Sequence, residues 1–351
     1  MKIPYIEING RKIGPKYPVY IVAELSANHN QDFETAVKLI EAAKDAGADA
    51  VKVQTYTPDT ITIDVGRPEF KIKGGTLWDG KTLYELYKEA YMPWDWHKEL
   101  KKIANKLGLD FFSTPFDPTA VDFLEELGVP AYKIASPEIV DIPLIEKVAE
   151  TGKPIIISTG MATLGEIEEA IQAVRRKGNN QIILLKCTSA YPAPYESMNL
   201  KTIPNMMETF GVPVGLSDHT LGIEIPIAAV ALGASIVEKH FTLSRSIQTP
   251  DSAFSLEPQE FKTMVQAIRN VEKALGDVRY GTDKSEEEIK KFRRSLYIVE
   301  DVKKGELFTE KNVKSIRPGY GLPPKYLKDI LGRKARYDIP KGTPLRWEFV
   351  D

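Results

Sequence analysis

Two of the four histidines in the chain, His219 and His240, end short apolar runs in the phrases GLSDHT and VEKHF. If those runs are neighbouring parallel strands, about 5 Å apart, both imidazoles can reach one divalent cation. Two histidine ligands leave positions open for water or substrate, as Lewis-acid catalysis requires. The same spacing also fits two ordinary hydrogen-bonded histidines, so both interpretations stay open at this point.

A second group of polar side chains is suited to holding a small polyanion. Lys52 and Lys133 lie within apolar runs, where a buried ammonium is costly unless a carboxylate or a bound anion compensates its charge. A structural salt bridge to Glu24 or Glu238 is one alternative. The other is a site for a molecule with a carboxylate and a phosphate, such as phosphoenolpyruvate or a sugar phosphate. Hydroxyl residues also end other apolar runs. Taken singly, each is more often a helix N-cap than a ligand contact, but together they would lie at one rim; they are Ser113, Thr114, Ser136, Ser158, Thr159, Thr188, Ser189 and Ser217.

The remaining candidate residues are weaker. Asn28 and His29 in ELSANHN either contact a sugar or cap the helix that begins near Asp32. His97 is expected to be structural. Cys187 lies in an apolar run with no obvious histidine partner, which predicts a buried, inert thiol.

The elements that must position these residues alternate between short β-branched runs and amphipathic helical stretches. Asp32 is a plausible N-cap, Gly47 a helix stop, and Thr163 and Glu166 have the spacing of a capping box. Eight such units predict an α/β fold, a closed (β/α)₈ TIM barrel, with its polar residues at the carboxyl ends of the strands. The expected strands are residues 19–25, 50–54, 109–114, 131–136, 154–159, 182–187, 213–218 and 235–240.

Two segments depart from this rhythm. The stretch from Thr55 to Met92 is a long insertion after a strand and is expected to cover the active site. The end of the chain contains two similar phrases, DVKKGELFTEKNV and DIPKGTPLRWEFV, each predicted as a strand, a Lys-Gly turn and another strand. The predicted domains are therefore a catalytic barrel over 1–280, a linker over 281–294 and a small, mostly β module over 295–351.

Composition excludes several classes of function. The 351 residues carry 47 basic and 49 acidic side chains, a net charge of −2, which favours neither nucleic acid nor an anionic membrane as a partner. The single cysteine allows no internal disulfide, and the start MKIPYIEING lacks the features of a secretion signal. A cytoplasmic protein is expected.

With these residues in view, the chain resembles the sialic acid synthase family of nonulosonate synthases over nearly its whole length. The motifs that carry the resemblance are ELSANHN, AVKVQTY, STPF, YKIASPE, ISTGM, KCTSAYPAPYE, GLSDHT and EKHF. Within that family, IKGGTLWDGKTLYELY, ASPEIVDIPLI and DSAFSLEPQEF look most like pseudaminic acid synthases. The module over 295–351 is similar to the family's antifreeze-like (SAF) domain.

The resemblance implies condensation of phosphoenolpyruvate with an acylated amino-sugar aldehyde, with C–O cleavage and release of phosphate. The implied acceptor is 2,4-diacetamido-2,4,6-trideoxy-L-altrose, which gives pseudaminic acid. The alternative is an N-acetylneuraminate or legionaminate synthase that uses N-acetylmannosamine or a 6-deoxy diacetamido mannose.

The resemblance also implies roles for individual residues. His219 and His240 would hold a divalent cation, Mn²⁺ with Mg²⁺ or Co²⁺ as alternatives, and Glu24 would transfer a proton or position the sugar. Ser189 stands where sialic acid synthases typically carry asparagine, so a weaker or water-mediated phosphate contact is expected there. The residues implied for phosphoenolpyruvate are Lys52, Thr114, Lys133, Ser136, Ser158, Ser189 and Ser217, and those for the sugar are Gln54, Tyr191, Asp251 and Arg317.

Members of this family form homodimers in which the SAF domain is swapped onto the partner's barrel. By similarity, Arg317 in IRPGYG would touch the acyl group of the sugar bound to the other subunit. Truncation near Lys291 is therefore expected to abolish synthesis.

Two rival functions remain. A Schiff-base aldolase would use Lys186, on the sixth expected strand, as its nucleophile. A protein that only binds a sugar phosphate would not need His219 and His240.

Overall fold

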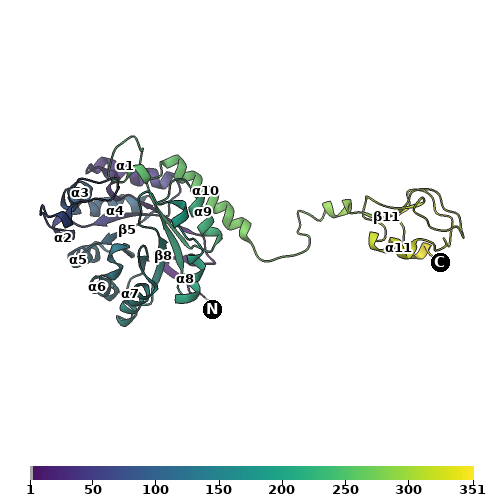
Figure 1. Ribbon diagram of the computed structural model, residues 1–351, viewed down its shortest axis with the longest axis horizontal. Helices are drawn as coiled ribbons and strands as arrows, with labels where there is room; N and C mark the ends of the chain where they lie inside the picture. The colour runs from purple at the N-terminus through teal and green to yellow at the C-terminus, as the bar shows by residue number, and fades with distance from the viewer. Residues whose placement is uncertain (1–2) are drawn as a thin grey trace. The chain divides into compact units, whose positions relative to one another are not determined.

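The computed structural model describes residues 3–351, which divide into two compact units (Figure 1). The first unit ends at Gly276 and the second spans Asp277–Asp351, so the expected linker over 281–294 belongs to the second unit. No helix in the described part of the chain is long and apolar enough to cross a membrane.

The first unit is a closed barrel of eight parallel strands in the order β10-β3-β4-β5-β6-β7-β8-β9, which confirms the predicted TIM barrel. The strands are β3 Tyr20–Glu24, β4 Ala50–Thr55, β5 Asp110–Pro115, β6 Tyr132–Ile134, β7 Ile155–Ser158, β8 Ile182–Cys187, β9 Val214–Asp218 and β10 Ile236–His240. The helices that follow them and surround the barrel are α1 Phe33–Asp45, α4 His97–Lys106, α5 Pro118–Leu127, α6 Ile142–Glu150, α7 Leu164–Arg176, α8 Thr202–Phe210, α9 Glu224–Ala231 and α10 Pro258–Leu275 (Figure 1).

The predicted helix signals are confirmed. The side chain of Asp32 accepts a hydrogen bond of 2.7 Å from the amide of Thr35, which caps α1. Thr163 and Glu166 form a reciprocal capping box at the start of α7. Beyond the end of α1, Gly47 has φ +90°, a conformation that favours glycine.

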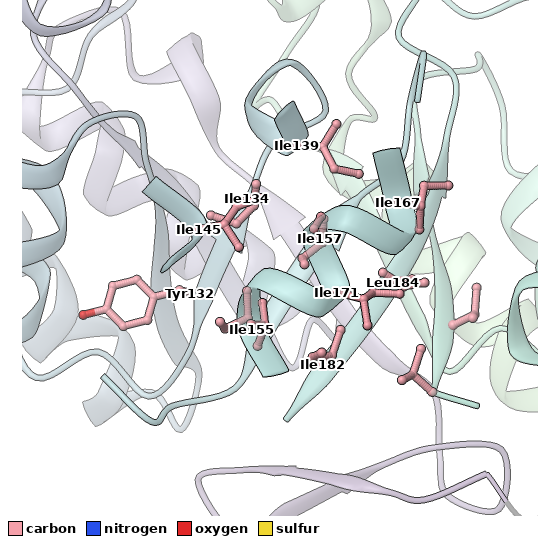
Figure 2. Close-up of a cluster of buried hydrophobic side chains, with 14 of the residues drawn as sticks. Tyr132, Ile134, Ile139, Ile145, Ile155, Ile157, Ile167, Ile171, Ile182 and Leu184 are labelled. Carbon is pink, nitrogen blue, oxygen red and sulfur yellow. The ribbon is translucent and has the colours of Figure 1, made fainter. Parts of the chain in front are cut away.

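Side chains alternate between the two faces of each barrel strand. On β7 and β8, Ile155, Ile157, Ile182 and Leu184 point outward into a buried apolar cluster with residues of α6 and α7 (Figure 2). Residues at the intervening positions, such as Ile183, point inward into a separate cluster. Because the period is two, the inward positions nearest the carboxyl ends are the ones that can face a ligand.

The N-terminal segment forms a hairpin of two short strands, β1 Ile6–Ile8 and β2 Arg11–Ile13. Ile6, Ile8 and Ile13 belong to the same buried cluster as the inward-pointing strand residues. The hairpin therefore supplies apolar side chains to the barrel interior, away from the polar carboxyl ends. Sequence analysis did not predict this hairpin, because strands of three residues are too short to show a clear period.

The insertion between β4 and α4 contains two helices, α2 Pro58–Ile61 and α3 Leu83–Ala90. The loop before α3 is tied internally, since Asp79 accepts hydrogen bonds from the amides of Gly75 and Thr76 at 2.8 and 2.9 Å. It is tied to the barrel by Trp78, whose Nε1 donates to the carbonyl oxygen of Pro250 at 2.9 Å. The insertion therefore lies against the loop that follows β10, consistent with the expected cover.

The second unit has its own buried core, which includes Leu296, Phe308 and Leu345. Its regular elements are the antiparallel strands β11 Ser295–Ile298 and β12 Val313–Ile316 and the helix α11 Leu327–Ile330. The two Lys-Gly turns are present, and their glycines, Gly305 and Gly342, have φ of +81° and +87°. The prediction of a continuous strand on both sides of each turn was wrong. The repeated phrases pair mainly through single bridges such as Val302 with Ile339, and residues Trp347–Phe349 form a 3₁₀ helix.

Candidate active site

Lys52 lies at the centre of a buried polar network inside the barrel. It reaches its position because β4 places Lys52 and Gln54 on the inward face while Val51 and Val53 pack outward. The Nζ atom of Lys52 is 2.7 Å from Oε2 of Glu24, 3.5 Å from Oε1 of Glu238 and 3.2 Å from Oγ1 of Thr114. The network thus joins residues of four barrel strands.

Lys133 extends this network across the barrel. Its Nζ donates to Oγ of Ser158 at 2.7 Å and lies 3.7 Å from Oε1 of Glu238, which also accepts a hydrogen bond of 3.1 Å from Ser217. Glu238 was foreseen only as a salt-bridge partner, yet it connects both lysines. Its position two residues before His240, on the same face of β10, is the signal that identifies it as a site residue.

The charges of this network are strongly coupled. Burial raises the pKa of Glu24, an effect that the nearby ammonium of Lys52 opposes but does not cancel. Burial also acts to raise the pKa of Glu238, but Lys133 and Lys52 outweigh it and hold that pKa below its usual value. The structural salt bridges considered for Lys52 are therefore present. Burial lowers the pKa of Lys133, so a bound anion would favour the charged ammonium there.

Beside Lys133, the hydroxyls of Ser136 and Ser189 converge on the backbone of Gly160. The amide of Gly160 donates to Oγ of Ser136 at 3.0 Å. A Cβ atom at residue 160 would lie closer to both hydroxyl oxygens than real Cβ atoms do. The absence of a side chain therefore keeps these hydroxyls and the backbone together, an arrangement suited to an oxyanion such as phosphate.

The rings of His219 and His240 lie side by side, with centroids 5.3 Å apart. Nδ1 of His219 is 3.0 Å from the carbonyl oxygen of Thr188, which can only accept, so Nδ1 carries a proton and Nε2 is the nitrogen that a cation can bind. Burial acts to lower the pKa of His219, but Cys187 and the Thr188 carbonyl outweigh it and raise that pKa. Nδ1 of His240 is buried and has no hydrogen-bond partner within residues 3–351. Burial and the neighbouring cations lower the pKa of His240 well below its usual value, which keeps this imidazole neutral.

This histidine pair fits a cation site with few protein ligands. An orphaned buried nitrogen and a neutral ring are what a metal ligand requires. No cluster of three or more His, Cys, Asp or Glu suited to a metal ion occurs in the described chain. The rings are enclosed by Tyr191, whose centroid is 4.4 Å from His219, and by Phe254, 4.9 Å from His240.

Cys187 departs from the expectation that it has no histidine partner. It is buried, as predicted, but its Sγ lies 3.9 Å from Nδ1 of His219. Burial acts to raise the pKa of the thiol, yet His219 and Lys133 outweigh it and lower that pKa to about 7. The pairing was missed because the two residues are 32 positions apart and meet only through the barrel.

The predicted sugar residues Gln54 and Asp251 join the carboxylates to the histidines. Nε2 of Gln54 donates to Oε1 of Glu24 and to Oγ of Ser26, both at 3.0 Å. Ser26 in turn donates to Asp251, and Oδ2 of Asp251 is 3.9 Å from Nδ1 of His240. Sequence analysis did not single out Ser26, whose φ of +42° is uncommon for a residue other than glycine.

Several other candidates lie outside this constellation. The side-chain amide of Asn28 donates to the carbonyl oxygen of Phe241 and to Oγ of Ser255, so Asn28 connects the segment after β3 to the segment after β10. His29 is fully buried and accepts a hydrogen bond from the amide of Gln31, so neither predicted role fits it. His97 bonds to Thr55 at 2.9 Å and is structural, as predicted.

The two remaining candidates are Lys186 and Arg317. Lys186 follows the outward positions Ile182 and Leu184 on β8 and donates to the carbonyl oxygen of Cys187 at 2.7 Å. This orientation disfavours the Schiff-base alternative. Arg317 is exposed and belongs to the second unit, so its role in the site stays a prediction.

Glu138, in the segment that follows Ser136, is a further polar residue that sequence analysis left without a role. It is mostly buried, and Oε2 has no hydrogen-bond partner within residues 3–351. Burial raises the pKa of its carboxyl to about 7, with Lys133 acting in the opposite direction. Such a carboxyl near a polar site is able to exchange a proton at neutral pH.

The comparisons with known proteins agree with this fold. Residues 39–280 match the NeuB family and residues 293–351 match the SAF domain. Pseudaminic acid synthase from Helicobacter pylori is 51% identical over 335 residues, which cover 95% of this chain and 98% of that protein. N,N'-diacetyllegionaminic acid synthase from Campylobacter jejuni is 43% identical, with 93% of this chain and 98% of that protein covered.

A solved structure extends the agreement to the arrangement of the chain. The crystal structure of N-acetylneuraminic acid synthetase from Leptospira borgpetersenii, in complex with citrate, superposes with a TM-score of 0.72 at 36% identity. The match covers 81% of this chain and 94% of that one. A barrel followed by an SAF domain thus agrees with the sequence matches, and the chain belongs to the NeuB family.

Proposed function

We propose that this protein condenses phosphoenolpyruvate with the open-chain aldehyde of an acylated amino sugar, forming a nonulosonic acid and releasing phosphate. The observation that carries the proposal is the position of Lys52 and Lys133, with their hydroxyl partners, in one barrel interior with His219 and His240. The proposed acceptor is 2,4-diacetamido-2,4,6-trideoxy-L-altrose and the product pseudaminic acid. The 51% identity to the Helicobacter pylori synthase supports this choice.

Phosphoenolpyruvate would lie between the two lysines and the group around Gly160. The ammonium groups of Lys52 and Lys133 offer charge-assisted hydrogen bonds to its carboxylate and phosphate, helped by Thr114, Ser158 and Ser217. Ser136 and Ser189 add hydroxyl groups at Gly160. This site would place C3 of phosphoenolpyruvate toward the histidines.

His219 and His240 would hold a divalent cation, for which we propose Mn²⁺, with Mg²⁺ or Co²⁺ as alternatives. When bound, the cation would polarise the carbonyl group of the sugar aldehyde. Tyr191 lies beside His219 and Asp251 beside His240, and Gln54 is joined to Asp251 through Ser26; these three residues would orient the sugar.

In the reaction, C3 of phosphoenolpyruvate forms a bond with the aldehyde carbon, using the electron pair of its double bond. The aldehyde oxygen takes up a proton and becomes a hydroxyl group. Glu24, whose pKa is raised by burial, would give that proton or position the sugar. Water adds to the cationic C2 and loses a proton. The C2 hydroxyl group then gives up its proton and forms the carbonyl group as the C2–O bond to phosphate breaks with its electron pair, which leaves the 2-keto acid and inorganic phosphate.

We also propose that the active form is a cytoplasmic homodimer in which the swapped SAF module of one subunit completes the site of the other. The partner subunit's Arg317 would contact the acyl group of the sugar. In support, Arg317 is close in sequence to Ile316 and Tyr320, which are 37% and 63% exposed, and Val278 and Tyr280 at the start of the second unit are almost fully exposed. Exposed apolar side chains of this kind are typical of surfaces that bind a partner.

A phosphate-release assay with phosphoenolpyruvate and a panel of acceptors tests the reaction. The panel contains the diacetamido altrose, its 6-deoxy mannose counterpart and N-acetylmannosamine. Fastest turnover of the altrose supports the proposal, whereas a preference for the mannose compound supports the legionaminate alternative, which the 43% identity to the Campylobacter jejuni enzyme favours second.

Two further experiments distinguish the proposed reaction from the rival functions. Loss of turnover in EDTA with rescue by Mn²⁺ supports the metal mechanism, and borohydride trapping of pyruvate on Lys186 would refute it. A protein that only binds sugar phosphates would release no phosphate with any acceptor, and its ligand binding would survive replacement of both His219 and His240 by Gln.

A further inference from the structure

A fully buried ion pair lies directly behind the two histidines. Asp218 immediately precedes His219 on the chain, and Lys239 immediately precedes His240. The two residues are register partners on β9 and β10, and their side chains are both 0% exposed. Because Ser217, Glu238 and the histidines point inward, Asp218 and Lys239 point outward into the layer between the barrel and its helices.

The ion pair also holds the residue that follows His219. The carboxylate of Asp218 accepts hydrogen bonds from the amide and the hydroxyl of Thr220, each at 3.0 Å. Nζ of Lys239 donates to the carbonyl oxygen of Thr220 at 2.6 Å, in addition to its contact with Asp218. The backbone is therefore held on both sides of His219 and tied to the residue before His240.

The surroundings argue against a purely stabilising role. Val237, two positions earlier on the same face of β10, packs in an apolar cluster with Val230 and Phe261. The free energy of removing two charges from water into such a layer offsets most of their mutual attraction. An apolar pair of similar size at the same position often gives an equally stable protein. The three hydrogen bonds from this ion pair to Thr220 instead fix the geometry of the backbone next to His219.

We propose that Asp218, Lys239 and Thr220 are positioning residues that set the spacing of His219 and His240 for the divalent cation. The inference rests on the proposed metal-dependent function. Within residues 3–351, the side-chain bonds of Asp218 and Lys239 join them to each other and to Thr220, whereas Lys52 and Lys133 contact Glu238 on the inward face. The network is therefore expected to act more strongly on cation binding than on anion binding.

The test is a Mn²⁺ titration of full-length, EDTA-treated protein, with free Mn²⁺ measured by electron paramagnetic resonance. Asp218→Asn removes the charge and the acceptor for the Thr220 hydroxyl while keeping the shape of the side chain. A second variant, Asp218→Leu with Lys239→Met, replaces the whole pair by apolar groups and serves if the first does not fold. Both variants are expected to weaken Mn²⁺ binding by about 10- to 100-fold, as other changes to groups that orient metal ligands do. Phosphoenolpyruvate binding, followed by calorimetry, should change much less, because Ser217 and Glu238 lie on the opposite face of the same strands.

Val237→Ala is the matched control, since it alters the same face of the same strand without touching the network. It should lower the melting temperature but leave the Mn²⁺ affinity unchanged. Wild-type Mn²⁺ affinity in a folded Asp218 variant overturns the positioning role alone, and so does an equal loss of affinity in Val237→Ala. Failure of the wild-type protein to bind Mn²⁺, Mg²⁺ or Co²⁺ would refute the proposed metal function and this inference with it.

Discussion

At the residue scale, the proposed anion site depends on residue 160 having no Cβ atom. Gly160→Ala would push that atom against the hydroxyls of Ser136 and Ser189. Displacing such groups by even part of an ångström lowers activity strongly, and we expect KM for phosphoenolpyruvate to rise by about 10- to 100-fold. Steady-state kinetics with varied phosphoenolpyruvate measure this effect.

Gly165→Ala provides the control for that change. A Cβ at residue 165 meets no other atom within 4 Å, and the residue lies in the first turn of α7. This variant should keep its kinetics and gain a little stability, because alanine is the better helix former. Equal kinetics for Gly160→Ala and wild type would show that the two serines do not contact phosphoenolpyruvate.

Glu138 links protonation to stability, since burial raises its folded-state pKa to about 7 from a usual value of 4.5. A carboxyl with a raised folded pKa stabilises the fold fully below the unfolded pKa, and this contribution is lost as pH rises through the folded pKa. Glu138→Gln should therefore be more stable than wild type by about 2–3 kcal/mol at pH 8 and show no such gain at pH 4. Melting curves over this pH range measure the difference. The exposed Glu169→Gln should follow wild type at every pH, and a Glu138→Gln curve parallel to wild type would contradict the account.

At the scale of elements, the barrel strands and most of the site could be predicted from the sequence. Each strand is a short β-branched run that ends in polar residues, so the run and its polar end together locate residues such as Lys52 and Lys133. A lysine belongs to the candidate site only if it occupies the inward face of its strand. Lys186 looked equivalent to them in its apolar run, but it occupies an outward position on β8.

Contacts between distant segments could not be read from the sequence. Ser26 with Asp251 and Cys187 with His219 join residues that only barrel closure brings together. The same holds for the tie between Trp78 and Pro250, which are 172 positions apart. Patterns of period two or 3.6 report which side of an element is buried, but not which other element covers it.

The insertion before α4 is expected to control access of the sugar. Trp78 donates to Pro250 and packs against Tyr191 with ring centroids 5.6 Å apart. Trp78→Ala removes both contacts and should raise KM for the sugar by about tenfold, since one hydrogen bond and one aromatic pair are together worth about 1–3 kcal/mol. Kinetics with varied sugar, alongside calorimetric phosphoenolpyruvate binding that should not change, measure the effect. The neighbouring Leu77→Ala is the control, because Leu77 is 51% exposed. Similar sugar KM values for the Trp78 and Leu77 variants would contradict a role for the tie.

At the scale of the whole molecule, the barrel and the SAF domain each have a separate buried core. This separation explains why the module could be recognised from its own motif, whereas the predicted role of Arg317 rests on the family resemblance alone. A truncated protein that ends near Lys291 keeps every core residue of the barrel. It should therefore fold and bind phosphoenolpyruvate.

Whether the site is completed by the other subunit can be decided with two inactive variants. His240→Gln leaves Arg317 intact, and Arg317→Ala leaves the histidines intact, so homodimers of either should release little phosphate. If Arg317 acts on the partner's barrel, a co-expressed mixed dimer contains one barrel with its histidines that faces an intact Arg317. Since random pairing makes half of the dimers mixed, about a quarter of wild-type activity should return. As a control for expression, a subunit with both His240→Gln and Arg317→Ala is co-expressed with wild type. Phosphate release should then be no greater than the wild-type subunits alone produce. No recovery in a verified mixed dimer would mean that Arg317 serves its own barrel or none, and the swapped arrangement would have to be abandoned.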